Sequence, residues 1–345
     1  MPRLALLLVA SLAASGLPAQ SPVVTDQVSG TTSLLQAVSA VNDRVVWASG
    51  HGGAVVRTTD GGAHWQLRPV AGAEKLEFRD VHALSAKVAW LLSAGPGPAS
   101  RIYRTADGGA TWSLQFTNAD TAAFFDCITF FDKRTGVAFS DAAGGRTLVL
   151  RTDDAGAHWN LLPPAAVPAP LPGEGAFAAS GGCVVNFGKH SGWIATGSPA
   201  GRILRSCDAG RTWQAFATPF VHGDGAGMTA TSWRSETRGI GVASQISARG
   251  ATDTASAVVG VTDDGGATWQ LGHRPTQPGG IYGVTWVPRG GPHTAVASAL
   301  SGLLVTTDAG TTWTQAATKP YWSVAAAGKR AWGVGPGGRI TRLDF

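Results

Sequence analysis

The chain has 345 residues, only 14% of them charged, and its formal net charge is +5 at neutral pH. It contains 47 glycines and 13 tryptophans but only three tyrosines. A nucleic-acid-binding protein would need a stripe of basic residues with interleaved aromatic residues, and the sequence has none. Many glycines and tryptophans with few charges instead favour a β-protein with many tight turns.

The first twenty residues predict a secretory signal peptide. Arg3 precedes an apolar run from Leu4 to Ala14, and small residues follow up to Gln20. This order is typical of exported bacterial proteins. The run is too short for a transmembrane helix, and no later stretch reaches about 18 apolar residues. We therefore expect residues 1–20 to be removed and residues 21–345 to be exported to the periplasm or the medium, without a transmembrane segment.

An eight-residue motif with the pattern [ST]-x-D-x-G-x-[TH]-W recurs six times along the rest of the chain. The first copy is TTDGGAHW at 58–65, and the others begin at residues 105, 152, 206, 262 and 306. Each copy follows apolar runs separated by Gly and Asn or Asp turns, as in antiparallel hairpins. The interval of 44 to 56 residues between copies fits one four-stranded blade of a β-propeller.

The two ends of the chain predict how the ring of blades closes. Residues 323–345 supply three strands and no copy of the motif, whereas residues 23–30 form a strand with no other partner. Joining these segments in one sheet removes open sheet edges, which favour aggregation. The sequence therefore predicts an all-β fold, a monomeric seven-bladed propeller in a single domain closed by the N-terminal strand.

Each copy of the motif is expected to form the turn between the third and fourth strands of a blade, called here the aspartate turn. Its aspartate accepts hydrogen bonds from the turn backbone, and its glycine takes a positive φ. The structural aspartates are Asp60, Asp107, Asp154, Asp208, Asp264 and Asp308. Turns spaced around a ring cannot converge on one substrate, so we expect a structural role, also for His64 and His158 within them.

The motif resembles the Asp-box, or BNR, repeat of bacterial sialidases and related β-propellers. Three segments are similar, within that group, to the photosystem II stability and assembly factors and their bacterial relatives: WASGHGGAVVRTTDGG (47–62), GRILRSCDAGRTW (201–213) and AWGVGPGGRI (331–340). The resemblance implies an exported, non-catalytic binding or assembly propeller, with its aspartate turns away from the functional face. No glycine-rich dinucleotide turn leads into a helix, and we expect no cofactor.

The functional face is expected where loops link one blade to the next and the second strand to the third. Such a concave, partly aromatic face suits a protein segment or a small ligand. No three residues there have the spacing of metal ligands, so we expect no metal. The candidate ligand-binding residues are His51, Arg79, Asp80, Asp126, Asp141, Glu174, His222, Tyr282 and Trp322.

Carboxylates on this face leave an enzymatic alternative open. Asp80 and Asp126 are expected at equivalent positions of neighbouring inner strands, where they form a carboxylate pair or else bond to loop backbone or Arg79. A carbohydrate hydrolase, sialidase-like or other, would use Asp80, Asp126 or Glu174 as its acid. A sialidase would also need an arginine triad and a tyrosine nucleophile, and Tyr103 lies in the wrong place for one.

Two further features have two interpretations each. The link at 161–182 is proline-rich, hence extended, and is either a functional loop or a packed cover over the channel. Cys127 and Cys183 each lie nine residues before a glycine, on neighbouring inner strands where blade two has Val81. They are either buried small apolar residues or an inter-blade disulfide, which export permits. Cys207 lies in an aspartate turn and should be an exposed thiol.

Overall fold

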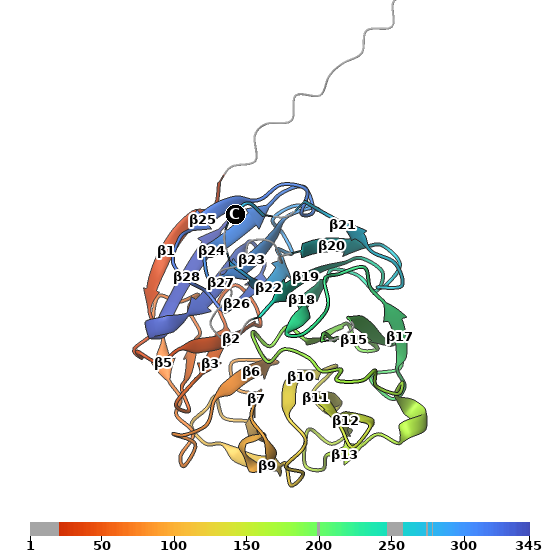
Figure 1. Cartoon of the computed structure of the whole chain (residues 1–345). Helices are drawn as coiled ribbons and strands as arrows, with labels where there is room; N and C mark the ends of the chain where they lie inside the picture. Colours follow the sequence, from red (N-terminus) through yellow and green to blue (C-terminus); the bar gives the residue numbers. More distant parts are fainter. Residues whose placement is uncertain (1–20, 199–200, 247–257, 274, 278) are drawn as a thin grey trace, which may run out of the picture.

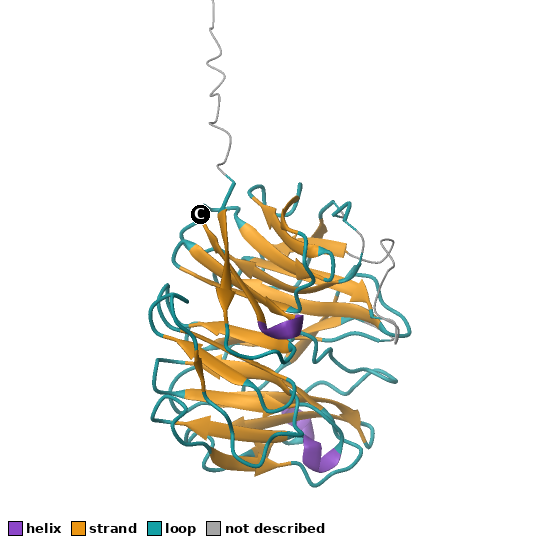
Figure 2. Ribbon diagram, turned by 90° about the vertical axis from the view of Figure 1, so that its left-hand side faces the viewer, coloured by secondary structure: helices purple, strands orange, loops and turns teal. Residues whose placement is uncertain are grey.

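The computed structural model describes residues 21–198, 201–246, 258–273, 275–277 and 279–345. The predicted signal peptide therefore lies outside the described residues. Seven four-stranded antiparallel sheets are arranged in a ring (Figure 1) around a central channel lined by their inner strands, and strands and loops dominate every part of the ring (Figure 2). This arrangement confirms the predicted seven-bladed propeller.

Each blade runs outward from the channel in four strands. The innermost strands are β2 Leu35–Ala40, β6 Phe78–Ala83, β10 Phe125–Phe130, β14 Val184–Phe187, β18 Ala226–Trp233, β22 Ile281–Trp286 and β26 Ser323–Ala327. The second strands are β3 Val46–Gly50, β7 Ala89–Ser93, β11 Gly136–Ala143, β15 Ser191–Ala195, β19 Gly239–Gln245, β23 Ala295–Ala299 and β27 Arg330–Gly335.

The third strands are β4 Val55–Thr58, β8 Arg101–Thr105, β12 Arg146–Thr152, β16 Arg202–Ser206, β20 Val258–Thr262, β24 Gly302–Thr306 and β28 Arg339–Asp344. The outer strands are β5 Gln66–Leu67, β9 Ser113–Thr117, β13 Asn160–Leu161, β17 Gln214–Ala217, β21 Gln270–Leu271, β25 Thr314–Ala317 and β1 Val23–Val28. Three short 3-10 turns complete the assignment of the described chain: η1 Gly97–Ala99, η2 Pro164–Ala166 and η3 Pro336–Gly338.

The closing blade combines both ends of the chain, as predicted. Strand β1 pairs with β28 over its whole length, from Val23 opposite Asp344 to Val28 opposite Arg339. The Asp26 carboxylate accepts a hydrogen bond from Thr341 at 2.6 Å and forms an ion pair with Lys319 at 2.7 Å. The N-terminal strand thus replaces the outer strand that residues 323–345 lack.

The core lies between adjacent blades and is built on tryptophans of the second strands. Trp47, Trp90, Trp193 and Trp332 are fully buried. The indole of Trp90 stacks on Phe130 of the next blade at 3.7 Å between ring centroids, and its N–H donates to a backbone carbonyl. The indole N–H groups of Trp47 and Trp193 also donate to backbone carbonyls. Each of the four rings removes a large apolar area from water, so these residues hold neighbouring blades together.

Each aspartate turn is a closed set of local hydrogen bonds. In the second one, the Thr105 hydroxyl donates to Asp107 at 2.8 Å and accepts from the N–H of Gly109 at 2.8 Å. Asp107 also accepts from the N–H and the hydroxyl of Thr111, at 2.9 and 2.6 Å. These donors lower the pKa of Asp107 below its usual range, and the same backbone bonds recur in the other five turns.

Candidate binding site

A one-residue bulge near the start of five inner strands shapes the face opposite the aspartate turns. The register shifts at Gln36, Arg79, Asp126, Thr229 and Tyr282. Such a bulge bends its strand and changes the direction of a side chain. Three of these residues, from three successive blades, line one cavity: Gln36, Arg79 and Asp126.

This cavity, called here the blade-link cavity, has a volume of about 380 Å³. Its polar lining is Gln36, His51, Arg79, Asp126 and Asp141. Its apolar lining is Leu34, Phe124, Ala176, Phe177, Ala178, Ala179, Ile246 and Trp322. Mostly apolar walls with a few polar groups are the composition of a ligand site. Five of the nine predicted candidates therefore meet here: His51, Arg79, Asp126, Asp141 and Trp322.

One side of the cavity carries a chain of polar contacts between the first two blades. His51 Nε2 lies 2.6 Å from Oε1 of Gln36 and therefore donates to it. The Arg79 guanidinium donates to the Glu77 carboxylate at 2.6 and 2.9 Å. Burial is the largest effect on His51 and lowers its pKa, so this ring is neutral at neutral pH. The positive charge of Arg79 is offset by Glu77.

The other side of the cavity carries two carboxyl groups of the third blade. Asp126, on the inner strand, is 1% exposed, and its Oδ2 has no hydrogen-bond donor among the described residues. Its carboxyl is hydrogen-bonded to that of Asp141. Burial, followed by the charge of Asp141, raises the pKa of Asp126 well above its usual value, and burial also raises the pKa of Asp141. Two carboxyl groups that share a site favour the state in which one of them is protonated.

The long blade link at 161–182 separates this cavity from the central channel. Gln36 donates to the carbonyl of Ala178 at 2.9 Å. Ser180 donates to the carbonyl of Tyr282 at 2.7 Å and accepts from Ser323 through its own carbonyl at 2.8 Å. The link is therefore hydrogen-bonded to blades on both sides of the ring. This arrangement agrees with a packed cover over the channel, one of the two interpretations of this segment.

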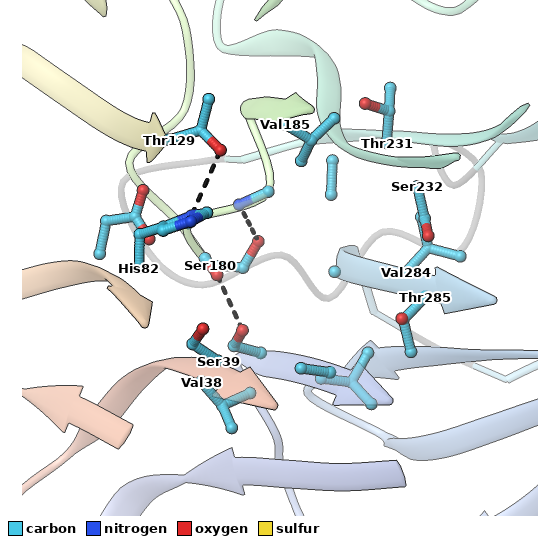
Figure 3. Close-up of a pocket in the computed structure, with 18 of the residues that line it drawn as sticks. Val38, Ser39, His82, Thr129, Ser180, Val185, Thr231, Ser232, Val284 and Thr285 are labelled. Atoms are coloured by element: carbon cyan, nitrogen blue, oxygen red, sulfur yellow. Dashed lines mark hydrogen bonds between the residues drawn. The ribbon is translucent and has the colours of Figure 1, made fainter. Parts of the chain in front are cut away.

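The channel beyond this cover has a volume of about 240 Å³ and is lined by the inner strands of all seven blades. His82 is one of the lining residues, and its Nδ1 is 3.3 Å from the Thr129 hydroxyl (Figure 3). Thr129 in turn donates to Asn186 at 2.9 Å. Burial lowers the pKa of His82 to about 4. These contacts join blades two, three and four across the channel wall.

The expected equivalence of Asp80 and Asp126 is wrong, because the inner strand of blade two begins at Phe78 and that of blade three at Phe125, and each has its bulge one residue later. Arg79 is the residue of blade two that matches Asp126, and Asp80 matches Cys127. Asp80 lies on the channel side of the cover, where its Oδ2 accepts from the N–H of Ile128 at 2.7 Å. Burial raises its pKa to about 8. The residue of blade two that corresponds to Cys127 is therefore Asp80, whereas the sequence predicted Val81.

Three other candidates lie apart from the cavity lining. Glu174 is buried, forms an ion pair with Arg202 and accepts from Thr196 at 2.7 Å, which fastens the long link to blade four. His222 contacts the carbonyl of Phe220 at 3.0 Å. Tyr282 is 1% exposed and packs on Trp322 with ring centroids 4.7 Å apart. It thus supports a wall of the cavity from behind.

Gln36, Glu77, Phe124 and Phe177 were not among the predicted site residues. Gln36 could have been found, since it directly follows the first apolar residue of its inner strand, as Arg79 and Asp126 do in theirs. Glu77 lies just before an inner strand and gave no comparable signal. Phe124 and Phe177 lie in blade links, and their approach to one cavity depends on the three-dimensional path of those loops.

Cys127 and Cys183 form a disulfide with 6.0 Å between their Cα atoms. It joins strand β10 to the residue before β14, so it links blades three and four. Both cysteines are fully buried, which places the bond inside the packed region between the blades. Cys207 is a free, exposed thiol in the fourth aspartate turn.

The tyrosines and the possible metal ligands of the described residues bear on the expected chemistry. Tyr103, Tyr282 and Tyr321 are all buried, with at most 6% of each exposed, so none presents a free nucleophilic hydroxyl. Within the described ranges, no group of three or more His, Cys, Asp and Glu side chains is placed to hold a metal ion. In the same ranges, no helix has the length and apolar character needed to cross a membrane.

Comparisons with known proteins identify relatives of the fold only. No protein-family model matches the chain, and no curated protein is similar to it in sequence.

Among solved structures, YCF48 bound to a D1 peptide has a TM-score of 0.66 at 15% identity, covering 95% of this chain and 98% of that one. YCF48 from Cyanidioschyzon merolae has a TM-score of 0.65 at 16% identity, covering 93% and 98%. The Niastella koreensis GH74 enzyme has a TM-score of 0.64 at 14% identity, covering 93% of this chain but 53% of that one. The chain therefore shares its overall fold with the YCF48 structures and with part of a GH74 enzyme.

Proposed function

We propose that this protein is an exported, non-catalytic propeller that binds a segment of another protein on the face of the blade links. The blade-link cavity is the observation that carries this proposal. It is concave, apolar on most of its walls and lined by side chains from several blades, which is the form of a recognition site. The likeness to YCF48 bound to a D1 peptide supports the same class of partner, and residues 1–20 support export.

The alternative, a carbohydrate hydrolase, is supported by the likeness to GH74 enzymes but not by the carboxyl groups. Glycoside hydrolysis needs two carboxyls about 5–10 Å apart, with the sugar between them. The carboxyls of Asp126 and Asp141 interact directly with each other, so no sugar can lie between them. Asp80 lies on the far side of the cover, and Glu174 is neutralised by Arg202. The three predicted acids thus face different surroundings.

A selection experiment tests the binding proposal. Random twelve-residue peptides displayed on phage would be selected on the purified protein, and the recovered peptides measured by fluorescence anisotropy. Ala176→Trp places a large ring in the cavity and should abolish their binding. Ala110→Trp is the matched control, because Ala110 is exposed in an aspartate turn at a position where Arg211 and Thr311 stand in other turns.

The result would separate the two functions. Peptides that lose binding with Ala176→Trp and keep it with Ala110→Trp would support a binding face. If no peptide is recovered, while the protein hydrolyses members of a glycan panel and Ala176→Trp stops that hydrolysis, the binding proposal fails. N-terminal sequencing of protein recovered outside the cytoplasm should start near residue 21 if the chain is exported.

A further inference from the structure

The blade-link cavity combines a buried pair of carboxyls with aromatic walls, and this combination indicates which ligand group it accepts. Oδ2 of Asp126 lies in a residue that is 1% exposed and has no hydrogen-bond donor among the described residues. A buried acceptor without a donor costs free energy. As carboxylates, Asp126 and Asp141 are both acceptors, so only a shared proton or an external donor satisfies the pair.

The charges around the pair leave the cavity negative. Arg79 lines the cavity, and its guanidinium donates to Glu77 at 2.6 and 2.9 Å. His51 donates to Gln36 and has a pKa lowered by burial, so it adds no positive charge at neutral pH. With one proton between them, Asp126 and Asp141 keep one negative charge.

Aromatic side chains complete the cavity. Phe124, Phe177 and Trp322 line the same space as the carboxyl pair, and Trp322 is held from behind by Tyr282 at 4.7 Å between centroids. Aromatic faces attract cations, particularly those that carry alkyl groups and have lost their water. A metal ion or an inorganic cation would gain little from these walls, whereas an organic ammonium gains from walls and carboxyls together.

We propose that the blade-link cavity binds an alkylammonium group, such as a lysine side chain of the bound segment, between Asp126 and Asp141 and the aromatic wall. The identification of the ammonium as part of a protein segment rests on the proposed function. The ammonium supplies the donors that the carboxyl pair lacks and replaces the proton that the pair otherwise shares. Its butyl stem occupies the apolar part of the cavity.

The test uses small probes, so that it is independent of any protein partner. Protein labelled with ¹⁵N would be titrated with n-butylammonium and, separately, with n-butanol, while the indole resonance of Trp322 is followed. The two probes have the same apolar stem, but only the first carries a charge and three N–H donors. We expect n-butylammonium to bind at least about tenfold more tightly, as expected for hydrogen bonds to charged groups. An equal affinity for both probes would overturn the proposal.

Two variants and one control locate the effect. Asp126→Asn and Asp141→Asn should each abolish the preference for n-butylammonium over n-butanol. Asp263→Asn removes the same charge from an exposed side chain outside the cavity and should keep the preference. A preference that survives both cavity variants would place the ammonium elsewhere and overturn the proposal. Selected peptides that bind through the cavity equally well after Lys→norleucine substitution would overturn it while leaving the proposed function intact.

The dependence on pH gives a second readout. Binding of the ammonium displaces the proton shared by Asp126 and Asp141, so affinity should rise as pH increases from 5 to 8. The other titratable and charged groups facing the cavity are His51, Glu77 and Arg79. Glu77→Gln and His51→Gln serve as checks on the two groups that can titrate, and both should retain the rise. Affinity for n-butylammonium that falls or stays level over this range in wild-type protein would contradict displacement of a proton.

Discussion

The backbone N–H of Ala176 donates to Oδ1 of Asp141 at 2.9 Å, so one carboxyl both fastens the long blade link and takes part in the carboxyl pair. Asp141 lies where the register of strand β11 shifts, and Ala176 belongs to the link between blades three and four. The link therefore encloses the cavity through the same group that gives the cavity its charge. Different substitutions of Asp141 should therefore loosen the link or remove the charge of the carboxyl pair separately.

Asp141→Ala should raise the hydrogen-exchange rate of residues 174–180, whereas Asp141→Asn should not. Alanine removes the acceptor of the Ala176 N–H, but asparagine keeps an oxygen at that position. Exchange of the peptide would be followed by mass spectrometry at constant pH. Asp263→Ala, which removes a carboxylate outside the cavity, is the control. Equal protection of 174–180 in Asp141→Ala and wild type would show that this bond does not hold the link.

Asp80→Asn should stabilise the protein relative to wild type at pH 8 and above, but not at pH 4. The pKa of Asp80 is raised to about 8, chiefly by burial, whereas an unfolded aspartate titrates near pH 4. The folded state therefore holds a proton that the unfolded state releases, and wild-type stability falls as pH rises from about 4 to about 8. The expected difference is roughly 2 to 5 kcal/mol at pH 8.

Urea unfolding of the two proteins at several pH values measures this difference. Asparagine keeps an acceptor for the N–H of Ile128, so the comparison isolates the charge. Asp126 and Asp141 titrate in both proteins and cancel in the difference. Parallel stability curves for wild type and Asp80→Asn between pH 4 and 8 would contradict a raised pKa at Asp80.

The repeats allowed most of the fold to be predicted, because each blade contains its own turn signals. Six aspartate turns and the incomplete seventh unit gave the number of blades, and the lone strand at 23–30 gave the closure. The expected alignment of two inner strands was nevertheless wrong by one residue. The sequence has Phe-x-Asp at both places, FRD at 78–80 and FFD at 124–126, so Asp80 was matched with Asp126. The strands begin at Phe78 and Phe125, and Arg79 is the counterpart of Asp126.

The cavity was harder to predict than the face on which it lies. The order of the strands predicted which end of the blades carries the site, and five predicted residues meet there. The path of residues 161–182 decided the rest, since it carries Phe177 into the cavity and divides Asp126 from Asp80. Gly181 illustrates the constraint: its φ is +74°, and a Cβ there would collide with the Asp80 carboxyl. Such tight passage depends on contacts between distant segments, which a single sequence does not display.

Glu174→Gln should destabilise the long link and lower the free energy of unfolding by about 3–5 kcal/mol. Glu174 and Arg202 form a buried ion pair with 3% and 14% of their side chains exposed, and removal of one charge leaves the other buried and uncompensated. Chemical unfolding monitored by tryptophan fluorescence measures the loss. The double variant Glu174→Gln with Arg202→Met should recover part of it. If Glu174→Gln instead leaves stability unchanged and stops a hydrolytic activity, the residue is an acid and not an anchor.

Reduction of the disulfide between Cys127 and Cys183 should lower the free energy of unfolding by about 2–4 kcal/mol, because the bond restricts the unfolded chain over a separation of 56 residues. Urea unfolding with and without reductant measures the effect. The double variant Cys127→Ala with Cys183→Ala should be insensitive to reductant, whereas Cys207→Ser should respond as wild type does, because Cys207 is a free thiol. Alkylation under denaturing conditions should modify one cysteine before reduction and three afterwards. Three modified cysteines before reduction would show that blades three and four are held by packing alone.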